Sequence, residues 1–265
     1  MTATISTIET RVAGPEGELF VQRWQPDHQT GSPIVLFHDS LGSVSLWRDF
    51  PAALASATGR EVIAYDRLGF GQSDSNPQTL DPKTFVADEA QQGFAALVDG
   101  LGLVRFVLFG HSVGGAMAAV CAARFNDRCD ALITESAQGF TEELTLQGIR
   151  EAKANFAQPG QVDRLKRYHG DKAEWVLSAW IDSWLSADFA DWTLEGILPD
   201  VTCPVLSIHG DHDEFGSLAH PAFFTAKAQG PGTVKVLEGV GHVPHREDAA
   251  TVLEIVSGFL SHLSH

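Results

Sequence analysis

The chain has 265 residues, of which 44% are hydrophobic and 20% charged, and this composition suits one large α/β domain or such a domain with a modest insertion. Its 34 acidic and 18 basic side chains give a formal net charge of −16, so nucleic acid and anionic membranes would be repelled. The first ten residues have no basic start and no apolar run, and no stretch of about 18 apolar residues follows. We therefore expect a cytoplasmic protein that acts on a small molecule, and the oligomeric state stays open.

Cysteine and glycine patterns argue against a bound cofactor. Cys121, Cys129 and Cys203 cannot all pair with one another and form no C-x-x-C motif, so we expect reduced thiols in the core. No G-x-G-x-x-G or phosphate-loop pattern occurs, which predicts no organic cofactor. A metal site in the segment 209–213, HGDHD, would need further converging ligands that the sequence does not offer. We predict no metal.

Short β-rich segments alternate with longer helical ones along most of the chain. Expected strands lie at 18–24, 33–37, 61–65, 105–109, 131–134, 204–208 and 233–237. Expected helices lie at 46–58, 84–101, 113–125, 217–229 and 248–262. This alternation predicts a mostly parallel sheet with helices on both faces. Gly14, Pro15 and Gly17 near the first strand predict an antiparallel hairpin at the sheet edge.

One interval interrupts the alternation. Residues 138–199 contain no convincing strand, and their apolar residues recur at helical spacing, as in 175–185. We predict a helical cap or lid over 138–199, inserted into a core formed by 1–137 and 200–265.

A candidate nucleophile lies in the segment 110–114, which reads GHSVG. An apolar strand precedes it and a small-residue helix former follows, which is the setting of a nucleophile elbow. Glycines on both sides would allow a strained backbone that presents the Ser112 hydroxyl above the sheet edge. We predict Ser112 as the nucleophile.

In five motifs and in their order, the sequence resembles the α/β-hydrolase superfamily. The motifs are 38–40 (HDS), 66–73 (DRLGFGQS), 110–114 (GHSVG), 210–213 (GDHD) and 241–244 (GHVP). The similarity is greatest to serine members with a helical cap, such as small esterases, proline-iminopeptidase-like enzymes and menaquinone-pathway or carbon–carbon bond hydrolases. It implies a mostly parallel eight-stranded sheet with helices on both faces and a helical lid.

A serine hydroxyl needs a base in hydrogen-bond reach and a carboxylate that orients this base. We predict His242 as the base because it lies in a glycine-containing loop after a strand; His245, the nearest rival, is expected at the surface, and His111 in a packing or hydrogen-bonding role. The resemblance assigns the acid to Asp213, in the chain order serine, aspartate, histidine. Glu135 and Asp211 remain alternatives for the acid.

The tetrahedral intermediate of acyl transfer needs donors for its oxyanion. Val113 should supply one backbone amide, and by resemblance Ser40 supplies the other. The chain departs from the family at Asp39, where glycine is usual, and a carboxylate there would oppose the oxyanion unless it is paired, with Arg67 as a candidate partner.

A serine at the elbow favours acyl chemistry over the alkyl-ester chemistry of branches with aspartate there. We predict a hydrolase of small carboxylic esters. A carbon–carbon bond hydrolase, a thioesterase or a lactonase on the same triad, and a ligand receptor without turnover, remain alternatives. Aromatic residues of the insertion, Phe140, Trp180 and Trp184 among them, are expected to line an apolar pocket. Arg150 or Lys153, if turned inward, would favour a substrate that bears a carboxylate.

Overall fold

The structure is a computed structural model and describes residues 4–263. These residues form an eight-stranded sheet in the order β1-β2-β4-β3-β5-β6-β7-β8. The strands are β1 (Ile5–Ala13), β2 (Glu18–Pro26), β3 (Ile34–Phe37), β4 (Val62–Tyr65), β5 (Phe106–His111), β6 (Cys129–Glu135), β7 (Val205–Gly210) and β8 (Gly232–Leu237). The pairs β1–β2 and β2–β4 are antiparallel and the other pairs are parallel, so the expected mostly parallel sheet with an edge hairpin is confirmed.

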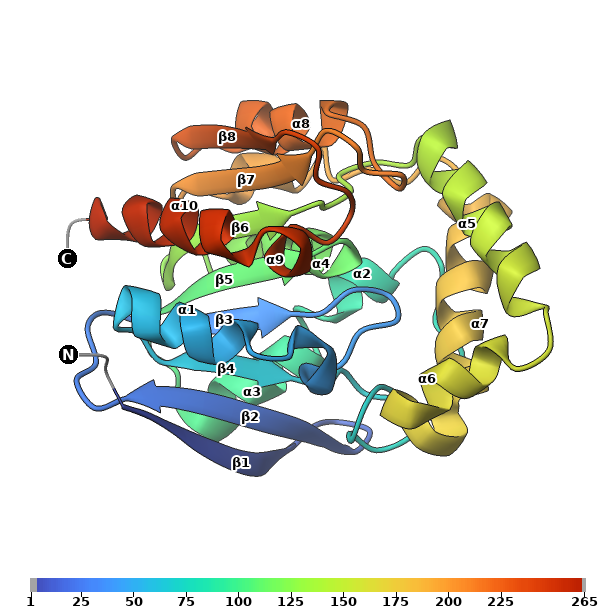
Figure 1. Ribbon diagram of the computed structural model, residues 1–265, viewed down its shortest axis with the longest axis horizontal. Helices are drawn as coiled ribbons and strands as arrows, with labels where there is room; N and C mark the ends of the chain where they lie inside the picture. The colour runs from blue at the N-terminus through green and yellow to red at the C-terminus, as the bar shows by residue number, and fades with distance from the viewer. Residues whose placement is uncertain (1–3, 264–265) are drawn as a thin grey trace.

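Helices lie on both faces of this sheet, as Figure 1 shows. The helices are α1 (Phe50–Thr58), α2 (Phe85–Asp88), α3 (Gly93–Leu101), α4 (Val113–Arg124), α5 (Glu143–Phe156), α6 (Gln161–His169), α7 (Ala173–Trp184), α8 (Ala219–Lys227), α9 (Pro244–Glu247) and α10 (Ala249–Ser261). Short 3₁₀ turns lie at Val44–Trp47, Gly170–Lys172, Ala187–Phe189 and Leu198–Asp200.

Two apolar clusters hold the helices on the sheet. In one cluster α1 and α10 pack on one face through residues such as Leu54 and Val256. In the other, α3 and α4 pack on the opposite face through residues such as Phe94 and Met117. The central strands β3, β4 and β5 are buried along their whole length, as strands covered on both faces must be.

The segment 84–101, expected as one helix, forms two. The Tyr65 hydroxyl donates a hydrogen bond of 2.7 Å to Glu89 Oε1, which draws this carboxylate toward the sheet. A Cβ atom at Gly93 would collide with the same carboxylate, so a glycine begins α3 after the break. The helix expected at 248–262 is α10, and the Asp248 side chain caps it by accepting from the Thr251 amide.

Residues 138–199 contain α5, α6 and α7, which lie beyond the carboxyl ends of the parallel strands (Figure 1). Ile149 of α5 and Ile181 and Trp184 of α7 belong to the same apolar cluster as α4. The segment is therefore anchored on the sheet side by its own apolar residues.

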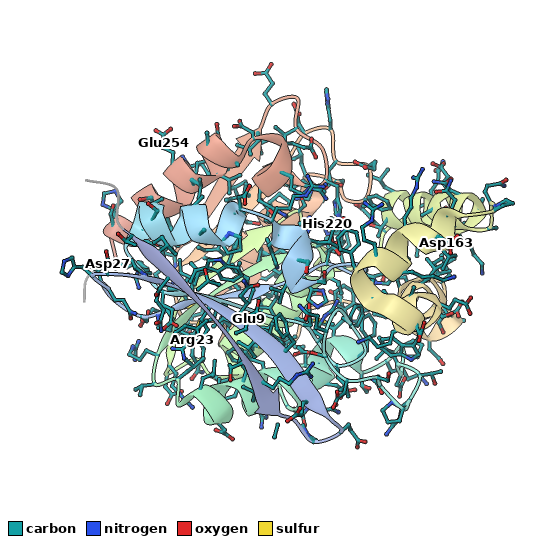
Figure 2. The ribbon with its side chains drawn as sticks, turned by 60° about the horizontal axis from the view of Figure 1, so that its bottom comes forward. Glu9, Arg23, Asp27, Asp163, His220 and Glu254 are labelled. Carbon is teal, nitrogen blue, oxygen red and sulfur yellow. The ribbon has the colours of Figure 1, made fainter. Side chains whose placement is uncertain are left out.

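The three cysteines are buried and unpaired, as expected for core thiols. Among the described residues no helix has the length and hydrophobicity that a membrane crossing requires. Exposed acidic side chains lie on distant elements, among them Glu9 on β1, Asp163 on α6 and Glu254 on α10, which Figure 2 labels.

Candidate active site

The turn from β5 into α4 carries Ser112 in a strained backbone conformation. Ser112 has φ 56° and ψ −129°, a region that residues with a Cβ rarely adopt. A Cβ atom at Gly110 would collide with the backbone of Gly114, and one at Gly114 with the carbonyl oxygen of Phe37. Glycine on both sides is therefore what allows β5, α4 and the end of β3 to approach so closely around Ser112.

The structure brings the three predicted triad side chains together. His242 Nε2 lies 3.1 Å from Ser112 Oγ, and His242 Nδ1 lies 2.8 and 2.9 Å from the two carboxylate oxygens of Asp213. An ionised carboxylate only accepts hydrogen bonds, so Nδ1 carries the proton and Nε2 is free to accept the serine proton. This tautomer is the one that proton transfer from Ser112 requires.

Asp213 is held in its ionised form. Burial alone would raise the pKa of this carboxyl, but the hydrogen bond and charge of His242, together with His209 and the Phe215 amide, hold it below its usual range. The Phe215 amide donates to Asp213 Oδ1 over 2.8 Å. A charged partner at Nδ1 would stabilise an imidazolium at His242.

The alternative acids lie elsewhere. Glu135 Oε2 pairs with His245 Nδ1 at 2.5 Å, and Asp211 Oδ1 accepts from the Gly239 amide at 2.7 Å. His245, expected at the surface, is instead 5% exposed, because its ring packs against Trp47 at 4.6 Å between centroids. The expectation of a surface position was wrong, since the partner that draws His245 inward lies 110 residues away in the chain.

Within residues 4–263, His111, Glu135 and His245 place possible metal ligands within 4.8 Å of one another, all buried. His245 and Glu135 already pair with each other, and His111 Nε2 lies 2.7 Å from the carbonyl oxygen of His242. These contacts hold the three side chains against one another and against the backbone of the His242 loop.

The loop after β3 carries the predicted oxyanion donor Ser40. The Ser40 amide has no acceptor among the described residues, and Val113 is the first residue of α4, where amides lack an intrahelical acceptor. The sequence offered Arg67 as a candidate partner for the Asp39 carboxylate, but the two do not form an ion pair. Arg67 Nη2 donates to the Asp39 backbone oxygen at 2.6 Å, while the carboxylate accepts from the Leu41 amide and faces His111 Nδ1 at 3.5 Å.

The Asp39 and His111 pair explains how a carboxylate can lie beside the donor loop. Burial alone would lower the pKa of His111, but the hydrogen bond and charge of Asp39 raise it to about 9. In turn, the hydrogen bond and charge of His111 hold the pKa of Asp39 well below its usual range, against the effect of burial. His111 is therefore positively charged at neutral pH and offsets the Asp39 charge.

A cavity of about 270 Å³ opens at Ser112 and His242. Trp180 and Trp184 line it as expected. Phe140 does not; its ring packs against His220 and Phe223, at 4.3 and 5.1 Å between centroids, so its expected place in the pocket was wrong. Apolar residues form most of the remaining wall, namely Leu41, Ile149, Ala152, Phe156 and Phe215.

Sequence reasoning missed two residues beside Ser112 and His242. Gln138 Oε1 lies 3.4 Å from Ser112 Oγ, and the Phe215 ring lies 5.0 Å from the His242 ring. Phe215 follows Asp213 by two residues and could have been found from that spacing. Gln138 carried no comparable signal, because its side chain reaches Ser112 only through the path of the chain after β6.

Arg150 and Lys153 point away from the cavity. Both are exposed, and Arg150 Nη1 pairs with Glu143 Oε1 at 2.6 Å on the outer side of α5. No lysine or arginine lies among the residues that line the cavity at Ser112.

Comparison with known proteins shows what the chain is similar to. The profile of a family described by the alpha/beta hydrolase fold matches residues 32–180. A 1-acylglycerol-3-phosphate O-acyltransferase of Homo sapiens is 33% identical over 119 residues, which cover 43% of this chain and 32% of the relative. A 2-hydroxy-6-oxo-2,4-heptadienoate hydrolase of Pseudomonas putida is 32% identical over 120 residues, 45% of this chain and 42% of the relative. In both cases the match spans less than half the length of the relative.

A solved structure extends the similarity over nearly the whole chain. A proline iminopeptidase of Mycobacterium smegmatis superposes with a TM-score of 0.72 and 25% sequence identity, and the match covers 96% of this chain and 98% of that one.

Proposed function

The chain belongs to the alpha/beta hydrolase fold family, and from this premise we propose that it is a serine hydrolase that cleaves small, neutral carboxylic esters. The observation that carries the proposal is the 3.1 Å contact of Ser112 Oγ with His242 Nε2 at the wall of an apolar cavity. A hydroxyl in this position is activated by the adjacent base, which an inert core serine is not.

In the proposed acylation step, Ser112 Oγ attacks the ester carbonyl carbon while His242 Nε2 takes the hydroxyl proton. The carbonyl oxygen becomes an oxyanion, to which the amides of Ser40 and Val113 donate, each worth about 3 kcal/mol of barrier. The intermediate collapses when the ester C–O bond breaks and His242 returns the proton to the departing alcohol oxygen. An acyl group then remains on Ser112.

In the proposed deacylation step, water attacks the acyl carbon and His242 Nε2 takes the water proton. The second tetrahedral intermediate breaks its bond to Ser112 Oγ, which recovers the proton from His242, and the carboxylic acid leaves. Asp213 holds the imidazole tautomer through both steps and stabilises its cation.

The character of the cavity supports a neutral substrate. Its wall is mostly aromatic and aliphatic, it offers no lysine or arginine, and the Asp39 carboxylate lies within it. A carboxylate such as the dienoate in the name of the Pseudomonas putida relative would find no cation there. This favours an ester, or a lactone of similar size, over a dienoate as the substrate.

We further propose that residues 138–199 act as the cap that sets acyl-chain preference. Helices α5 and α7 supply Ile149, Ala152, Phe156, Trp180 and Trp184 to the cavity wall. The space of about 270 Å³ is below the range of typical ligand pockets, roughly 300 to 1,000 Å³, so short acyl groups fit it best.

Covalent labelling tests the proposal directly. A fluorophosphonate should add its mass to Ser112 alone, and aryl esters of short fatty acids should be hydrolysed in preference to aryl thioesters and to dienoates. Ser112→Ala and His242→Ala should each lower kcat/KM by roughly 10³-fold or more, with unchanged circular dichroism. Residual activity within tenfold of the parent, or a chain that binds esters without reacting, would contradict a serine hydrolase.

A further inference from the structure

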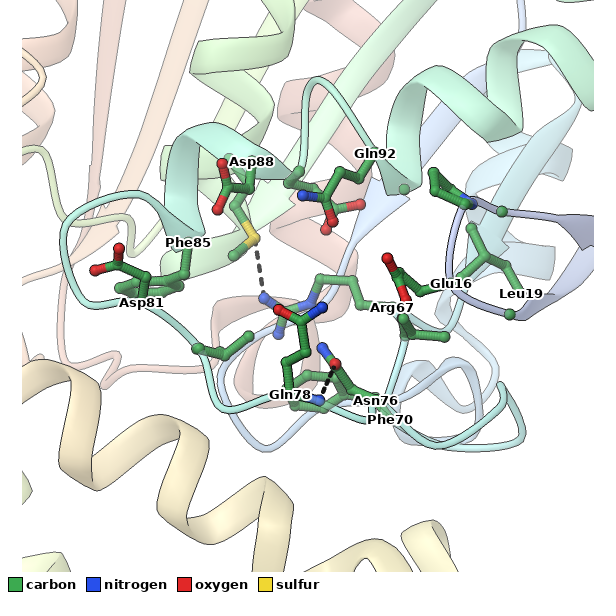
Figure 3. A pocket seen from close by; sticks show the side chains of 18 of the residues that line it. Glu16, Leu19, Arg67, Phe70, Asn76, Gln78, Asp81, Phe85, Asp88 and Gln92 are labelled. Carbon is green, nitrogen blue, oxygen red and sulfur yellow. Dashed lines mark hydrogen bonds between the residues drawn. The ribbon is translucent and has the colours of Figure 1, made fainter.

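A second cavity, of about 180 Å³, lies between the β1–β2 turn and the segment that leads into α3. It shares no lining residue with the cavity at Ser112. Figure 3 shows the Arg67 side chain in the middle of this cavity, with Glu16, Asp81 and Asp88 around it. Neither the family match nor the proposed ester hydrolysis gives this space a role.

The Arg67 guanidinium is a buried cation that no carboxylate contacts directly, and the charges of Glu89, Asp39 and Asp66 act on it from farther away. Arg67 is 5% exposed, and within residues 4–263 no carboxylate lies within 4.0 Å of it. Its acceptors are weak or neutral: the Met117 sulfur at 2.9 Å, the His38 ring nitrogen at 3.3 Å and the Asp39 carbonyl oxygen at 2.6 Å. A buried charge of this kind is unfavourable unless an anion pairs with it.

Four acidic side chains also line the cavity. Glu16 comes from the β1–β2 turn, and Asp81, Asp88 and Glu89 come from the segment before α3. A simple anion at Arg67 would therefore face four carboxylates, and a simple cation would lie beside the guanidinium. A ligand that carries one negative and one positive charge can pair with Arg67 and with the carboxylates at the same time.

We propose that this cavity binds a free α-amino acid with a small apolar side chain. The carboxylate accepts hydrogen bonds from the Arg67 guanidinium, and the ammonium group donates to the acidic side chains opposite. The apolar side chain packs on Leu19, Leu80, Phe85 and Met117. The volume suits an amino acid and is too small for a peptide or a nucleotide.

Isothermal titration calorimetry with L-leucine tests the site. The protein is first labelled at the active site with a fluorophosphonate, or carries Ser112→Ala if it does not label, so the result is independent of ester hydrolysis. We expect leucine to bind with a Kd below about 10 mM, a modest affinity for so small a ligand. We expect 4-methylpentanoate, which lacks the ammonium group, and 3-methylbutylamine, which lacks the carboxylate, to bind at least tenfold more weakly. Such a loss of affinity is what the removal of one charge-assisted hydrogen bond produces.

Variants locate the binding. Arg67→Met should abolish leucine binding, and where this variant fails to fold, the double variant Glu16→Gln with Asp88→Asn serves instead. That double variant should weaken the binding of leucine, because it removes the carboxylates that accept from the ammonium group. It should leave the binding of 4-methylpentanoate unchanged or make it tighter, because it removes carboxylates that repel this anion. Asp163→Asn on α6, an exposed acid away from the cavity, is the matched control and should change neither. No leucine binding, equal binding of leucine and 4-methylpentanoate, or unchanged leucine binding in the double variant would overturn the proposal.

Discussion

At the scale of single residues, His111 joins two loops that the proposed chemistry needs. Its Nδ1 faces the Asp39 carboxylate at 3.5 Å, and its Nε2 lies 2.7 Å from the His242 carbonyl oxygen. Asp39 precedes the proposed oxyanion donor Ser40, so one imidazolium compensates the acid on one side and holds the base-bearing loop on the other. His111 thus has the hydrogen-bonding role that the sequence predicted for it.

The charge of this pair predicts how stability depends on pH. The folded-state pKa of His111, about 9, exceeds its ordinary value of 6.5, so the folded chain binds more protons between these values. The stabilisation is fully present below pH 6.5 and is lost as pH rises through about 9. The pKa of Asp39 is lowered, so its share is present above its ordinary value of 3.8 and is lost as pH falls through the lower folded value.

Asp39→Asn should therefore lower the free energy of unfolding at pH 6.5 and flatten its decline between pH 6.5 and 9. Urea unfolding at several pH values measures both effects. Solvent weakens the pair, because the Asp39 side chain is 34% exposed, so the loss should be modest. Glu9→Gln, at an exposed acid on β1, is the control. An unchanged slope in Asp39→Asn would show that Asp39 does not set the charge of His111.

At the scale of elements, two helical glycines with opposite surroundings test the packing of α4. A Cβ atom at Gly114 would collide with the backbone carbonyl of Phe37, whereas one at Gly258 of α10 meets nothing within 4 Å. Gly258→Ala should raise stability by about 0.5–1 kcal/mol through the helix preference of alanine. Gly114→Ala should instead destabilise by about 1–3 kcal/mol, the usual cost of overpacking.

Thermal unfolding of both glycine variants, with fluorophosphonate labelling rates, checks this contrast. Gly114→Ala should also slow labelling, because displacement of α4 from β3 moves Ser112 and the Val113 amide relative to Ser40. Equal stability of the two variants would mean that α4 does not approach β3 as closely as the structure has it.

A matched pair on α5 tests whether the insertion sets acyl-chain length. Ala152 lines the cavity, whereas Ala154 on the same helix is exposed. Ala152→Trp should fill part of the space and lower kcat/KM for an aryl octanoate at least tenfold more than for an aryl acetate, since a lost apolar contact of a few methylene groups is worth about 1–3 kcal/mol. Ala154→Trp should leave the ratio unchanged. An unchanged ratio in Ala152→Trp would remove α5 from the acyl site.

At the scale of the whole molecule, the sequence predicted the fold well because each part of it is a local pattern. The short apolar segments at 33–37, 61–65 and 105–109 are typical of strands buried on both faces, and the order of five motifs indicated the topology. The strained turn at Ser112 was likewise readable from the glycines on both sides of it.

The details that sequence reasoning missed depend on contacts between distant parts of the chain. Phe140 turns toward His220 instead of the cavity, and Asp39 faces His111 instead of Arg67. His220 and His111 each lie about 70 or more residues along the chain from the side chain that they contact. Arg67 lies closer in the chain to Asp39, but it binds the Asp39 backbone oxygen, and the Asp39 carboxylate faces His111 instead. Phe140 and Asp39 both lie in loops between the named helices and strands, so no periodic pattern in the sequence assigns their side chains to a face.

The net charge of −16 adds a long-range contribution to substrate choice. An aryl hemisuccinate and an aryl butyrate have acyl groups of similar size, but only the hemisuccinate carries a carboxylate, which the acidic surface repels and the cavity leaves unpaired. We expect kcat/KM for the hemisuccinate to be at least about tenfold lower at low salt. Raising the ionic strength to about 0.5 M should narrow this difference in kcat/KM, because salt screens charges more than a few ångströms apart, while the butyrate rate stays constant.

Steady-state rates for both esters across a salt series measure the two contributions. The part of the difference that salt removes belongs to the surface, and the part that persists belongs to the cavity at Ser112. A preference for the hemisuccinate at any salt concentration would contradict the neutral-substrate assignment.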